Sequence, residues 1–434
     1  MTFQRAVEYL DSYINYEKVS VLKKRRSFNL RRVRYLLKRL GCPHQAYPSV
    51  LIAGTKGKGS TAATLKSVLR AHGLRVGLYT SPHLSSIRER ICVNNTQISE
   101  KEFAACITQL KKHILSDSFF KSELHRPTYF EILTVAAFMF FQKQKIDIAV
   151  VEVGLGGRLD ATNVLQPLIS VITRIGLDHQ MFLGRTLPAI AREKAAIIKK
   201  NQWAVIAPQV PVVQKVIQDR VQCVHACLHS GMNQAKLIAH DLVGVRFSWR
   251  HFQKLSLPLV GAHQFENATT ALEATYLLQR LGICRLQRHC IEKGLKEVTW
   301  PGRLEIIQKK SNCFVLDGAH NQESMHVLWK SMRHLFSKKP ILILAFSSDK
   351  LNRAIVGAVQ KISQSIIVTQ TKHARAVPAL QLKRYIMQAL PNTVLAPTVP
   401  KAIEKAIQMN HNGNPILVTG SLFAVAEARE VLFT

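Results

Sequence analysis

Short apolar runs alternate with amphipathic stretches from Ser49 onward. Runs rich in β-branched residues occupy 50–53, 76–79, 146–153, 168–173 and 204–207, and helical patterns separate them. This alternation predicts parallel α/β architecture, because each parallel strand needs a crossover helix before the next. Residues 208–258 are less regular, and either complete the first sheet or form a small β-rich region beside it. A helix is predicted from His263 to Arg280, with Gly282 as its C-cap.

The pattern breaks at 297–302 (EVTWPG) and then restarts. Further strands are predicted at 313–316, 341–346, 365–368, 393–395 and 416–418. A chain of 434 residues is also too long for one ordinary core. We therefore predict a P-loop-type parallel-sheet ATPase domain over 1–297 and a smaller Rossmann-like α/β domain over 298–434.

Composition is that of a soluble globular enzyme, with 47% hydrophobic and 20% charged residues. The longest apolar stretch, 132–141, is about half the length of a membrane span and predicts a buried helix. The first eighteen residues form an amphipathic pattern without an apolar signal region. The eight cysteines are irregularly spaced and form no CxxC, which is typical of reduced thiols. We expect a cytoplasmic monomer without membrane association.

The charge balance is unusual. Lys and Arg number 60 against 27 Asp and Glu, a formal charge of +33, which attracts polyanions. The densest cluster comprises Lys23, Lys24, Arg25, Arg26, Arg31, Arg32 and Arg34. No RNA-recognition or zinc-finger pattern accompanies it, so we favour an anionic substrate or a basic proteome over a dedicated nucleic-acid role.

Four possible zinc ligands alternate at Cys223, His225, Cys227 and His229. On one strand, next-but-one residues lie roughly 6.5–7 Å apart, too far for compact tetrahedral chelation without a turn. We predict that no zinc binds there.

The strongest local motif follows the first predicted strand. Its phosphate-binding candidates are Gly54, Thr55, Gly57, Lys58, Gly59, Ser60 and Thr61, and an amphipathic helix follows. Glycines allow backbone N–H groups to surround phosphates, the helix N-terminus adds a positive dipole end, and Lys58 can neutralise β- and γ-phosphates. The usual G-x-x-x-x-G-K-S/T spacing is imperfect, since Ile52 stands at its first glycine. The alternative is a glycine-rich turn without a ligand.

A second motif, EVGLGGRLDATN, begins at Glu152. A carboxylate at the end of a buried parallel strand, opposite a phosphate loop, is the usual holder of Mg²⁺. Further along, Asp178 and His179 follow another strand, and Thr186 caps a helix that carries Lys194. The plain alternatives are a structural histidine and an exposed lysine.

Two weaker motifs, PGRLE at 301–305 and DGAHN at 317–321, stand near strand ends in the second domain. Asp317 is suited to a ribose or phosphate partner. The residues by themselves thus indicate a two-domain α/β enzyme that uses ATP and Mg²⁺, without naming its substrate.

The ordered set of motifs resembles the folylpolyglutamate synthase and dihydrofolate synthase family of the Mur ligase superfamily. The set comprises GTxGKGST, TSPHL, FE-x-x-T, EVGLGGRLDATN, GLDH, LG-x-T, EKA, HQ-x-x-NA, PGRLE and DGAHN. With Gly420-Ser421 near the C-terminus, the resemblance covers almost the whole chain. GLGGRLDATN separates this branch from the cell-wall Mur ligases.

The resemblance implies an ATP-dependent amide ligase that adds L-glutamate to dihydropteroate, to (tetrahydro)folyl-polyglutamate, or to both, through an acyl phosphate. It implies that Asn267, Arg303 and Asp317 contact ATP with His320 beside them. One Mg²⁺ would be held by Ser81 and Glu152 and a second by Glu152 and His179, with Lys194 carbamylated. The pterin-side pocket would comprise Phe130, Glu131, Leu159, Asp160 and Ala161.

Several positions depart from the family pattern. Lys56 and Arg174 each replace an asparagine, and Ala196 replaces a glycine. The family's D-L-G-L loop, part of the pterin pocket in bifunctional members, is here Ser27-Phe28-Asn29-Leu30. Dihydrofolate synthesis, tail extension or both therefore stay open.

Two alternatives remain at this stage. A Mur-type ligase acting on a nucleotide-linked peptide would need a sizeable domain before the phosphate loop, where this chain has about fifty residues. A nucleic-acid-binding P-loop protein would show salt-sensitive binding.

Overall fold

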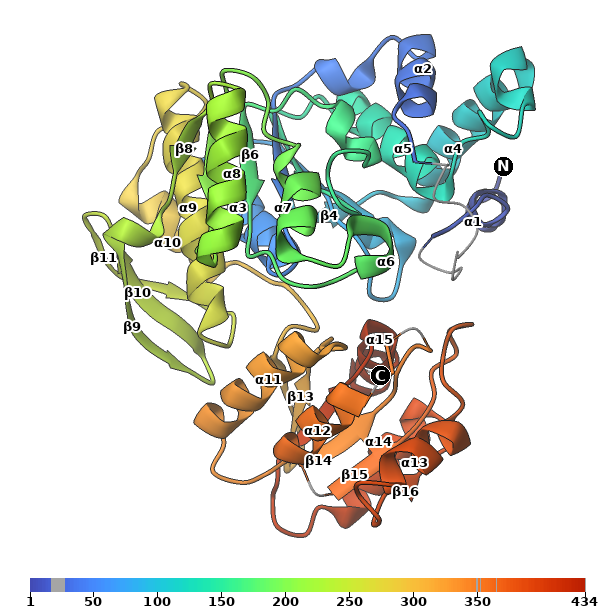
Figure 1. Cartoon of the computed structure of the whole chain (residues 1–434), viewed down its shortest axis with the longest axis vertical. Helices are drawn as coiled ribbons and strands as arrows, with labels where there is room; N and C mark the ends of the chain where they lie inside the picture. The colour runs from blue at the N-terminus through green and yellow to red at the C-terminus, as the bar shows by residue number, and fades with distance from the viewer. Residues whose placement is uncertain (17–27, 349, 352, 364, 434) are drawn as a thin grey trace. The chain divides into compact units, whose positions relative to one another are not determined.

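The computed structural model describes residues 1–16, 28–348, 350–351, 353–363 and 365–433. Lys23, Lys24, Arg25, Arg26 and Ser27 lie outside this part of the chain. The chain forms two compact units (Figure 1). The first comprises 1–238, 246–258 and 263–298, and the second comprises 239–245, 259–262 and 299–434. Both are α/β, which confirms the predicted fold class.

An eight-stranded sheet forms the centre of the first unit, in the order β4-β3-β2-β5-β1-β6-β7-β8. Its strands are β1 (Ser49–Ala53), β2 (Val76–Tyr79), β3 (Ile91–Val93), β4 (Thr96–Gln97), β5 (Ile148–Glu152), β6 (Ile169–Ile172), β7 (Trp203–Ile206) and β8 (Cys227–His229). All neighbours from β2 to β8 are parallel, and β3 and β4 add an antiparallel edge.

Helices cover both faces of this sheet, because alternate residues of each strand point to opposite sides. Val50 and Ile52 pack against α3 (Lys58–Ala71) and α9 (His263–Arg280), which lie side by side (Figure 1). Leu51 and Ala53 face the opposite cluster. That cluster includes residues of α1 (Phe3–Asp11), α2 (Arg31–Arg39), α4 (Glu100–Ser116), α5 (Tyr129–Lys143), α7 (Leu187–Ala195) and α8 (Pro211–Cys223).

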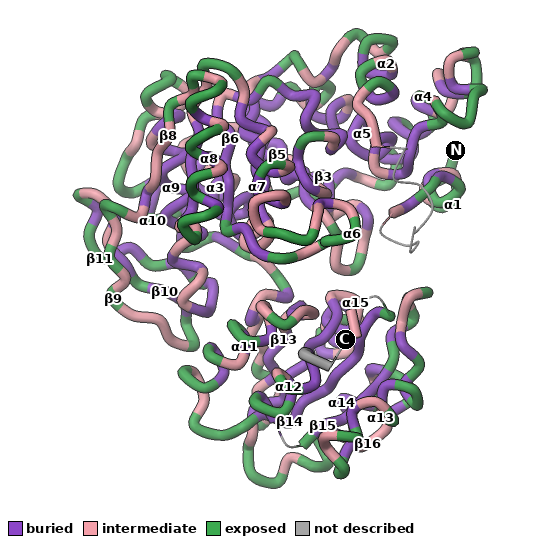
Figure 2. Tube along the Cα trace, viewed as in Figure 1, coloured by how far each residue is buried: buried purple, intermediate pink, exposed green. Residues whose placement is uncertain are grey.

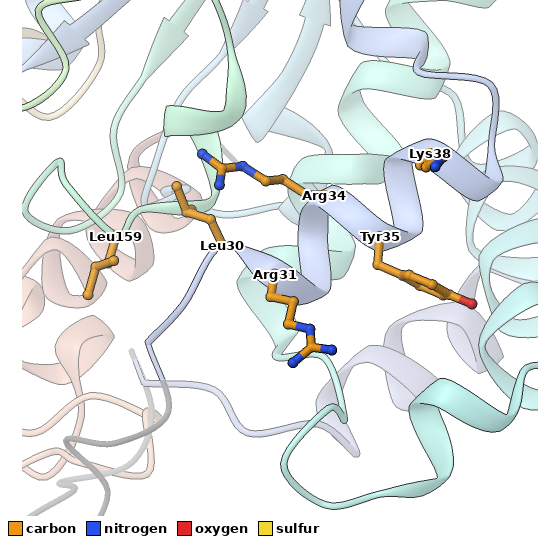
Figure 3. A pocket seen from close by; sticks show the side chains of 6 residues that line it. All are labelled: Leu30, Arg31, Arg34, Tyr35, Lys38 and Leu159. Atoms are coloured by element: carbon orange, nitrogen blue, oxygen red, sulfur yellow. The ribbon is translucent and has the colours of Figure 1, made fainter.

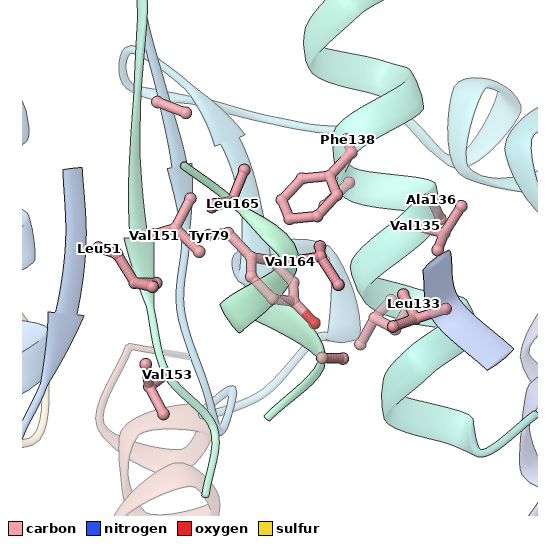
Figure 4. Close-up of a cluster of buried hydrophobic side chains, with 14 of the residues drawn as sticks. Leu51, Tyr79, Leu133, Val135, Ala136, Phe138, Val151, Val153, Val164 and Leu165 are labelled. Atoms are coloured by element: carbon pink, nitrogen blue, oxygen red, sulfur yellow. The ribbon is translucent and has the colours of Figure 1, made fainter. Parts of the chain in front are cut away.

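The helix α5 contains the long apolar stretch at 132–141. The Phe138 ring projects from α5 toward the sheet in Figure 4, and Leu133 belongs to the same buried cluster as Val151 of β5. The prediction of a buried helix is therefore confirmed. Within the described residues, no helix combines the length and the apolarity that crossing a membrane requires.

The irregular stretch 208–258 both completes the first sheet and forms a small β-rich region, the two possibilities that its pattern left open. Strand β8 completes the first sheet, while β9 (Ala235–Asp241), β10 (Gly244–Trp249) and β11 (Phe252–Leu257) form a separate sheet. The possible zinc ligands do not share a strand, because Cys223 ends α8 and His225 lies in a turn at φ +51°. Among the described residues, no group of three or more His, Cys, Asp or Glu is placed to hold a metal.

A six-stranded sheet forms the centre of the second unit, in the order β12-β13-β17-β14-β15-β16. Its strands are β12 (Glu305–Lys309), β13 (Asn312–Leu316), β14 (Ile341–Leu344), β15 (Ser365–Val368), β16 (Val394–Leu395) and β17 (Ile416–Thr419). The helices of this unit are α11 (Gln322–Leu335), α12 (Arg353–Ile362), α13 (Ala379–Met387), α14 (Val399–Met409) and α15 (Leu422–Phe433). Helix α10 (Arg288–Lys296) belongs to the first unit, where it packs on α3. The central strands of both sheets are buried along their length (Figure 2). Strand β12 is antiparallel to β13, an edge that the sequence pattern did not predict.

Candidate active site

Two glycines shape the phosphate loop between β1 and α3. Gly54 has φ +153°, and a Cβ there would lie 1.8 Å from Oγ1 of Thr173. Gly57 has φ +84°, and its Cβ would lie 2.1 Å from Oδ1 of Asn267. Both positions therefore require glycine, for reasons of backbone conformation and of space.

The loop is fixed to the segment that follows β6. The amides of Thr55 and Lys56 donate to the carbonyl of Arg174 at 2.9 and 3.1 Å, and the Thr55 hydroxyl donates to the carbonyl of Gly176 at 3.1 Å. The amides that open α3, at 58–60, have no acceptor within the helix. They form, with the positive end of the helix dipole, a ready anion site.

Glu152 ends β5 beside this loop. The residue is 4% exposed, and its carboxylate lies 3.7 Å from Nζ of Lys58 and accepts a hydrogen bond from the Ser81 amide at 3.2 Å. The pairing of Ile52 with Glu152 across β1 and β5 places the carboxylate next to the strand end that opens the loop. Lys58, Ser81 and Glu152 are thus brought together at the end of β5.

Lys194 is buried, which rules out the plain alternative of an exposed helical lysine. Its side chain on α7 is 5% exposed in fractional area, and Nζ donates to the carbonyl of Gly54 at 2.7 Å. Burial, followed by the nearby Lys58, lowers the pKa of Lys194 to about 7. A large fraction of its amine is therefore neutral at physiological pH.

His179 stands just before the short helix α6 (Gln180–Leu183). It is exposed and adopts a left-handed conformation at φ +49°. Its neighbour Asp178 lies 3.7 Å from Nζ of Lys56 on the phosphate loop. The loop lysine that departs from the family pattern therefore faces Asp178.

Asn267 reaches the phosphate loop from α9. It is buried, its Nδ2 donates to Oε1 of Gln264 at 2.9 Å, and its Oδ1 borders Gly57. One residue earlier, Glu266 lies 3.6 Å from the guanidinium of Arg174. The predicted nucleotide residues of the first unit thus gather around one loop.

On the predicted pterin side, Phe130 and Glu131 have different surroundings. The Phe130 ring covers Gly154, whose Cβ would lie 2.4 Å from it. The Glu131 carboxylate instead accepts hydrogen bonds from Arg32, with Nη2 at 2.9 Å, and from the Thr128 amide at 2.7 Å. Burial raises the pKa of Glu131 and these donors oppose the rise. Its oxygens are committed to protein donors.

Asp160 organises its own loop. Its carboxylate accepts hydrogen bonds from the amides of Leu155 and Thr162 at 2.8 and 3.0 Å and from the Thr162 hydroxyl at 2.5 Å. Burial raises the pKa of Asp160, and these hydrogen bonds partly offset that. Ala161 is buried, whereas Leu159 is half-buried and lines a pocket.

The predicted residues of the second unit form their own cluster. Asp317 follows β13 and accepts from the amides of Leu304 and Ala319, both at 2.9 Å. A Cβ on Gly318 would lie 2.6 Å from Nη1 of Arg303. Nδ1 of His320 lies 2.8 Å from the Gly318 carbonyl. The PGRLE and DGAHN motifs therefore meet at one end of β13.

Two family models match the chain, the Mur ligase middle domain over residues 52–275 and the Mur ligase glutamate ligase domain over 302–422. The dihydrofolate synthase/folylpolyglutamate synthase of Bacillus subtilis is 34% identical over 93% of this chain and 94% of its own length. This chain belongs to the folylpolyglutamate synthase/dihydrofolate synthase family of Mur ligases. The folylpolyglutamate synthase of Lacticaseibacillus casei is 30% identical and is matched over 99% of its length.

Solved structures of the family share the fold. A Mycobacterium tuberculosis folylpolyglutamate synthase complexed with ADP and AMPPCP has a TM-score of 0.87 and 29% identity, covering 100% of this chain and 98% of that one. The Thermotoga maritima folylpolyglutamate synthase has a TM-score of 0.86 and 32% identity, with 100% and 97% coverage. As a folylpolyglutamate synthase/dihydrofolate synthase family member, the chain is an ATP-dependent ligase.

Some residues of this ligase site were missed by the sequence reasoning. Arg32 was counted only as part of a basic cluster, yet it is 3% exposed and bound to Glu131, 99 residues away. Thr173, against Gly54, also carried no motif signal beyond its place at a strand end. Lys199, bound to Asn163, could have been suspected because it follows Lys194 in the EKA motif region.

Proposed function

We propose that this ligase adds L-glutamate to dihydropteroate and to reduced folyl-polyglutamates. The observation that carries the proposal is the set of charged groups at the phosphate loop: buried Glu152 lies 3.7 Å from half-buried Lys58, and buried Lys194 donates to the Gly54 carbonyl. The choice of substrates is supported by the dual name of the Bacillus subtilis relative and by the Phe130 ring over Gly154, beside Glu152.

The reaction begins when the substrate carboxylate attacks the γ-phosphorus of ATP. An oxygen–phosphorus bond forms as the bond to the β-phosphate oxygen breaks, which gives an acyl phosphate and ADP. Lys58 and the amides at the start of α3 stabilise the charge on the transferring group. The amine of glutamate then attacks the acyl carbon, inorganic phosphate leaves, and the amine loses a proton as the amide forms.

The donors around Glu152 fit a hard cation. Mg²⁺ binds oxygen ligands, commonly one or two carboxylates together with substrate phosphates. The Ser81 amide donates to the Glu152 carboxylate, so these two residues are neighbours. We assign one Mg²⁺ to Ser81 and Glu152 and a second to Glu152 and His179. When bound, the ions would neutralise phosphate charge.

The surroundings of Lys194 fit its carbamylation. Only a neutral amine adds to CO₂, and the pKa of about 7 supplies that form at physiological pH. The product is an anion in a pocket that also contains Lys58 and Lys56, the two cations that lower the Lys194 pKa. The carbamate would then help to hold Mg²⁺.

The remaining roles rest on the family pattern. Gly54 to Thr61 and Asn267 would bind ATP in the first unit, and Arg303, Asp317 and His320 would contact it from the second. Phe130, Leu159, Asp160 and Ala161 would form the pterin side. Glu131 would act there indirectly, by holding Arg32 and thereby α2.

The test is ADP release measured with dihydropteroate or tetrahydrofolate, each with and without L-glutamate. Glutamate-dependent release with both acceptors is expected. Release with one acceptor alone would restrict the function to that substrate. Release with neither, or with a nucleotide-linked peptide only, would overturn the proposal.

A further inference from the structure

A pocket of about 470 Å³ lies between α2 and the loop that follows Glu152 (Figure 3). It is lined by Leu30, Arg31, Arg34, Tyr35, Lys38 and Leu159. Leu30 and Arg34 reach toward the loop that carries Leu159 (Figure 3). Half of the lining residues are cations, and the other half are apolar or aromatic.

The cations of this pocket are arranged by the helix repeat. Arg31, Arg34 and Lys38 are three and four residues apart on α2 and are exposed, so neighbouring side chains start roughly 5–6 Å from one another. In the described part of the chain, no carboxylate forms an ion pair with Arg34 or Lys38. The nearby Asp117 is bound instead to Nε of Arg39 at 3.2 Å and to the Tyr35 hydroxyl at 3.1 Å.

More positive charge stands next to the pocket. Burial, followed by the nearby Arg220 and Arg34, lowers the pKa of Lys199 to about 8. Lys199 itself donates to the side chain and the carbonyl of Asn163, at 2.5 and 3.2 Å. Three cations so close together repel one another, and a bound anion would relieve that repulsion.

The lining favours a carboxylate ligand with apolar linkers over a nucleic acid. Leu30 and Leu159 offer contact to methylene groups between the charges. Single-stranded nucleic acid needs open aromatic faces on which its bases stack. The Tyr35 ring is already stacked on Phe119, with ring centroids 4.0 Å apart.

We propose that this pocket binds the free α-carboxylates of the γ-linked glutamate tail of a folyl-polyglutamate substrate. The inference rests on the proposed function and adds a recognition site for the tail. Dihydropteroate has a single carboxylate, which reacts, so it presents no tail. Each further glutamate adds one α-carboxylate, and only the terminal γ-carboxylate has to reach the loop at Glu152.

The kinetic test compares mono- and pentaglutamyl tetrahydrofolate as acceptors. The variant Arg34→Gln/Lys38→Gln keeps helix propensity while removing two charges. The ratio of kcat/KM for the long over the short substrate should fall by about three- to tenfold, mainly through KM. Lys293→Gln/Lys296→Gln on α10 loses the same charge at two exposed positions and should keep the wild-type ratio. An unchanged ratio in the α2 variant would overturn the inference.

A binding measurement tests the same inference without turnover. Fluorescein-labelled γ-linked pentaglutamate should bind the wild-type protein and the α10 variant, which a rise in its fluorescence anisotropy would show. With the α2 variant, the anisotropy should not rise. If the α-linked pentaglutamate or an oligothymidylate binds equally well and responds equally to the α2 substitutions, the pocket is a general anion site and the inference fails. If the wild-type protein ligates glutamate to neither acceptor, the proposed function fails. If it does so with a rate that is independent of tail length, only the role proposed for this pocket fails.

Discussion

At the scale of single residues, the candidate active site contains ionisable groups that are buried or that lie close to other charges. Glu152 is nearly inaccessible yet faces Lys58, and Lys194 is buried without a carboxylate at hydrogen-bond distance in the described structure. Such arrangements cost folding free energy and are found where ligands restore the balance of charge. Substitutions here should therefore separate activity from stability.

Lys58→Ala should reduce ATP turnover by about 10²–10³-fold, because one cation that stabilises the transferring phosphoryl group is lost. The side chain lies at the helix start and outside the apolar clusters, so the unfolding temperature should stay close to that of the wild type. ADP release and thermal unfolding measure the two effects. Lys296→Ala, at an exposed position, is the control. Near-normal turnover would remove this loop from the ATP site.

Glu152→Gln should abolish Mg²⁺-dependent turnover, since a neutral amide is a poor ligand for a hard dication. The measurement is the initial rate as a function of Mg²⁺ concentration. Glu404→Gln removes the same charge at an exposed ion pair and should leave the curve unchanged. A Glu152→Gln enzyme with wild-type rate and Mg²⁺ affinity would make Glu152 structural.

Lys194 carries the sharpest residue-level prediction. If it is carbamylated, activity should fall when CO₂ and bicarbonate are stripped and should return when they are restored. Lys194→Ala should be nearly inactive, and Lys194→Arg no better, because a guanidinium keeps its charge and forms no carbamate. A short carboxylic acid should partly restore the alanine variant. Full activity of that variant would leave Lys194 without a catalytic role.

The lowered pKa of Lys194 also predicts how stability depends on pH. Burial disfavours the charged amine in the folded protein, so between pH 7 and 10.5 the unfolded chain binds more protons and stability rises with pH. The cost is complete below about pH 7, where both states are protonated. In CO₂-free buffer, Lys194→Met should therefore unfold at a higher temperature than wild type at pH 6, with the gain shrinking toward pH 10. A variant less stable at every pH would contradict this.

At the scale of elements, the position of α2 depends on one buried ion pair. Arg32 of α2 contacts Glu131 of α5, and the same carboxylate forms the capping box at Thr128 that starts α5. The Glu131 side chain thus caps the N-terminus of α5 and also holds α2 in place through Arg32. The pocket cations Arg31 and Arg34 flank Arg32 on this helix.

Glu131→Gln should destabilise the protein by about 3–5 kcal/mol, because it leaves the Arg32 guanidinium buried without a charged partner. Adding Arg32→Met should recover much of this loss, since the uncompensated charge is then gone. Urea unfolding of the two variants measures the difference. Equal destabilisation by the single and the double substitution would show that Glu131 stabilises the protein mainly through the capping box and not through the ion pair.

The elements that could be predicted are those with strong apolar runs between clear boundaries. Strand β2, with Gly73 before it, strand β15, and helix α9, closed by Gly282, occupy the predicted ranges. Strands β3 and β4 were missed because they are only three and two residues long. Strand β12 was missed because it is an edge strand with polar residues, Glu305–Lys309, whose pairing depends on β13. Helix α8 was missed because it is polar on most of its surface, with Val213, Ile217 and Val221 buried.

The residues of the candidate site also differ in how well the sequence predicts them. Gly54, Lys58 and Glu152 were predictable because each is locally marked, by a glycine-rich turn or by a buried strand that ends in an acid. The pairing of Arg32 with Glu131 spans 99 residues and has no local signal. The buried state of Lys194 was also not predictable. It depends on the close approach of Gly157 to α7, where a Cβ would lie 2.5 Å from the Glu193 carbonyl.

At the scale of the whole molecule, the division into units does not follow the order of the chain. The second unit includes 239–245 and 259–262, which precede the last segment of the first unit. Val260 belongs to the apolar core of the second unit with Leu304 and Val315. Within the same unit, the rings of His240 and His334 lie 3.9 Å apart.

Residues 299–434 alone should therefore fold less stably than the same residues in the whole protein. The missing segments remove Val260 from the core and the His240 contact from α11. Hydrogen exchange at the amides of β13 and β17 compares the two chains. Val260→Ala in the full chain should weaken protection at the same amides and leave β1 and β5 unaffected. Equal protection in the fragment and the whole protein would make the inserted segments dispensable.

This interleaving also bears on how such a protein changes through evolution. A gene fragment that encodes residues 299–434 lacks 239–245 and 259–262 of the second unit, so simple exon exchange at this boundary cannot replace the second unit in full. A proteolytic cut after residue 298 should likewise leave two pieces that remain associated under native conditions. The two halves are consequently inherited as one piece, and a new acceptor specificity has to arise through substitutions within them.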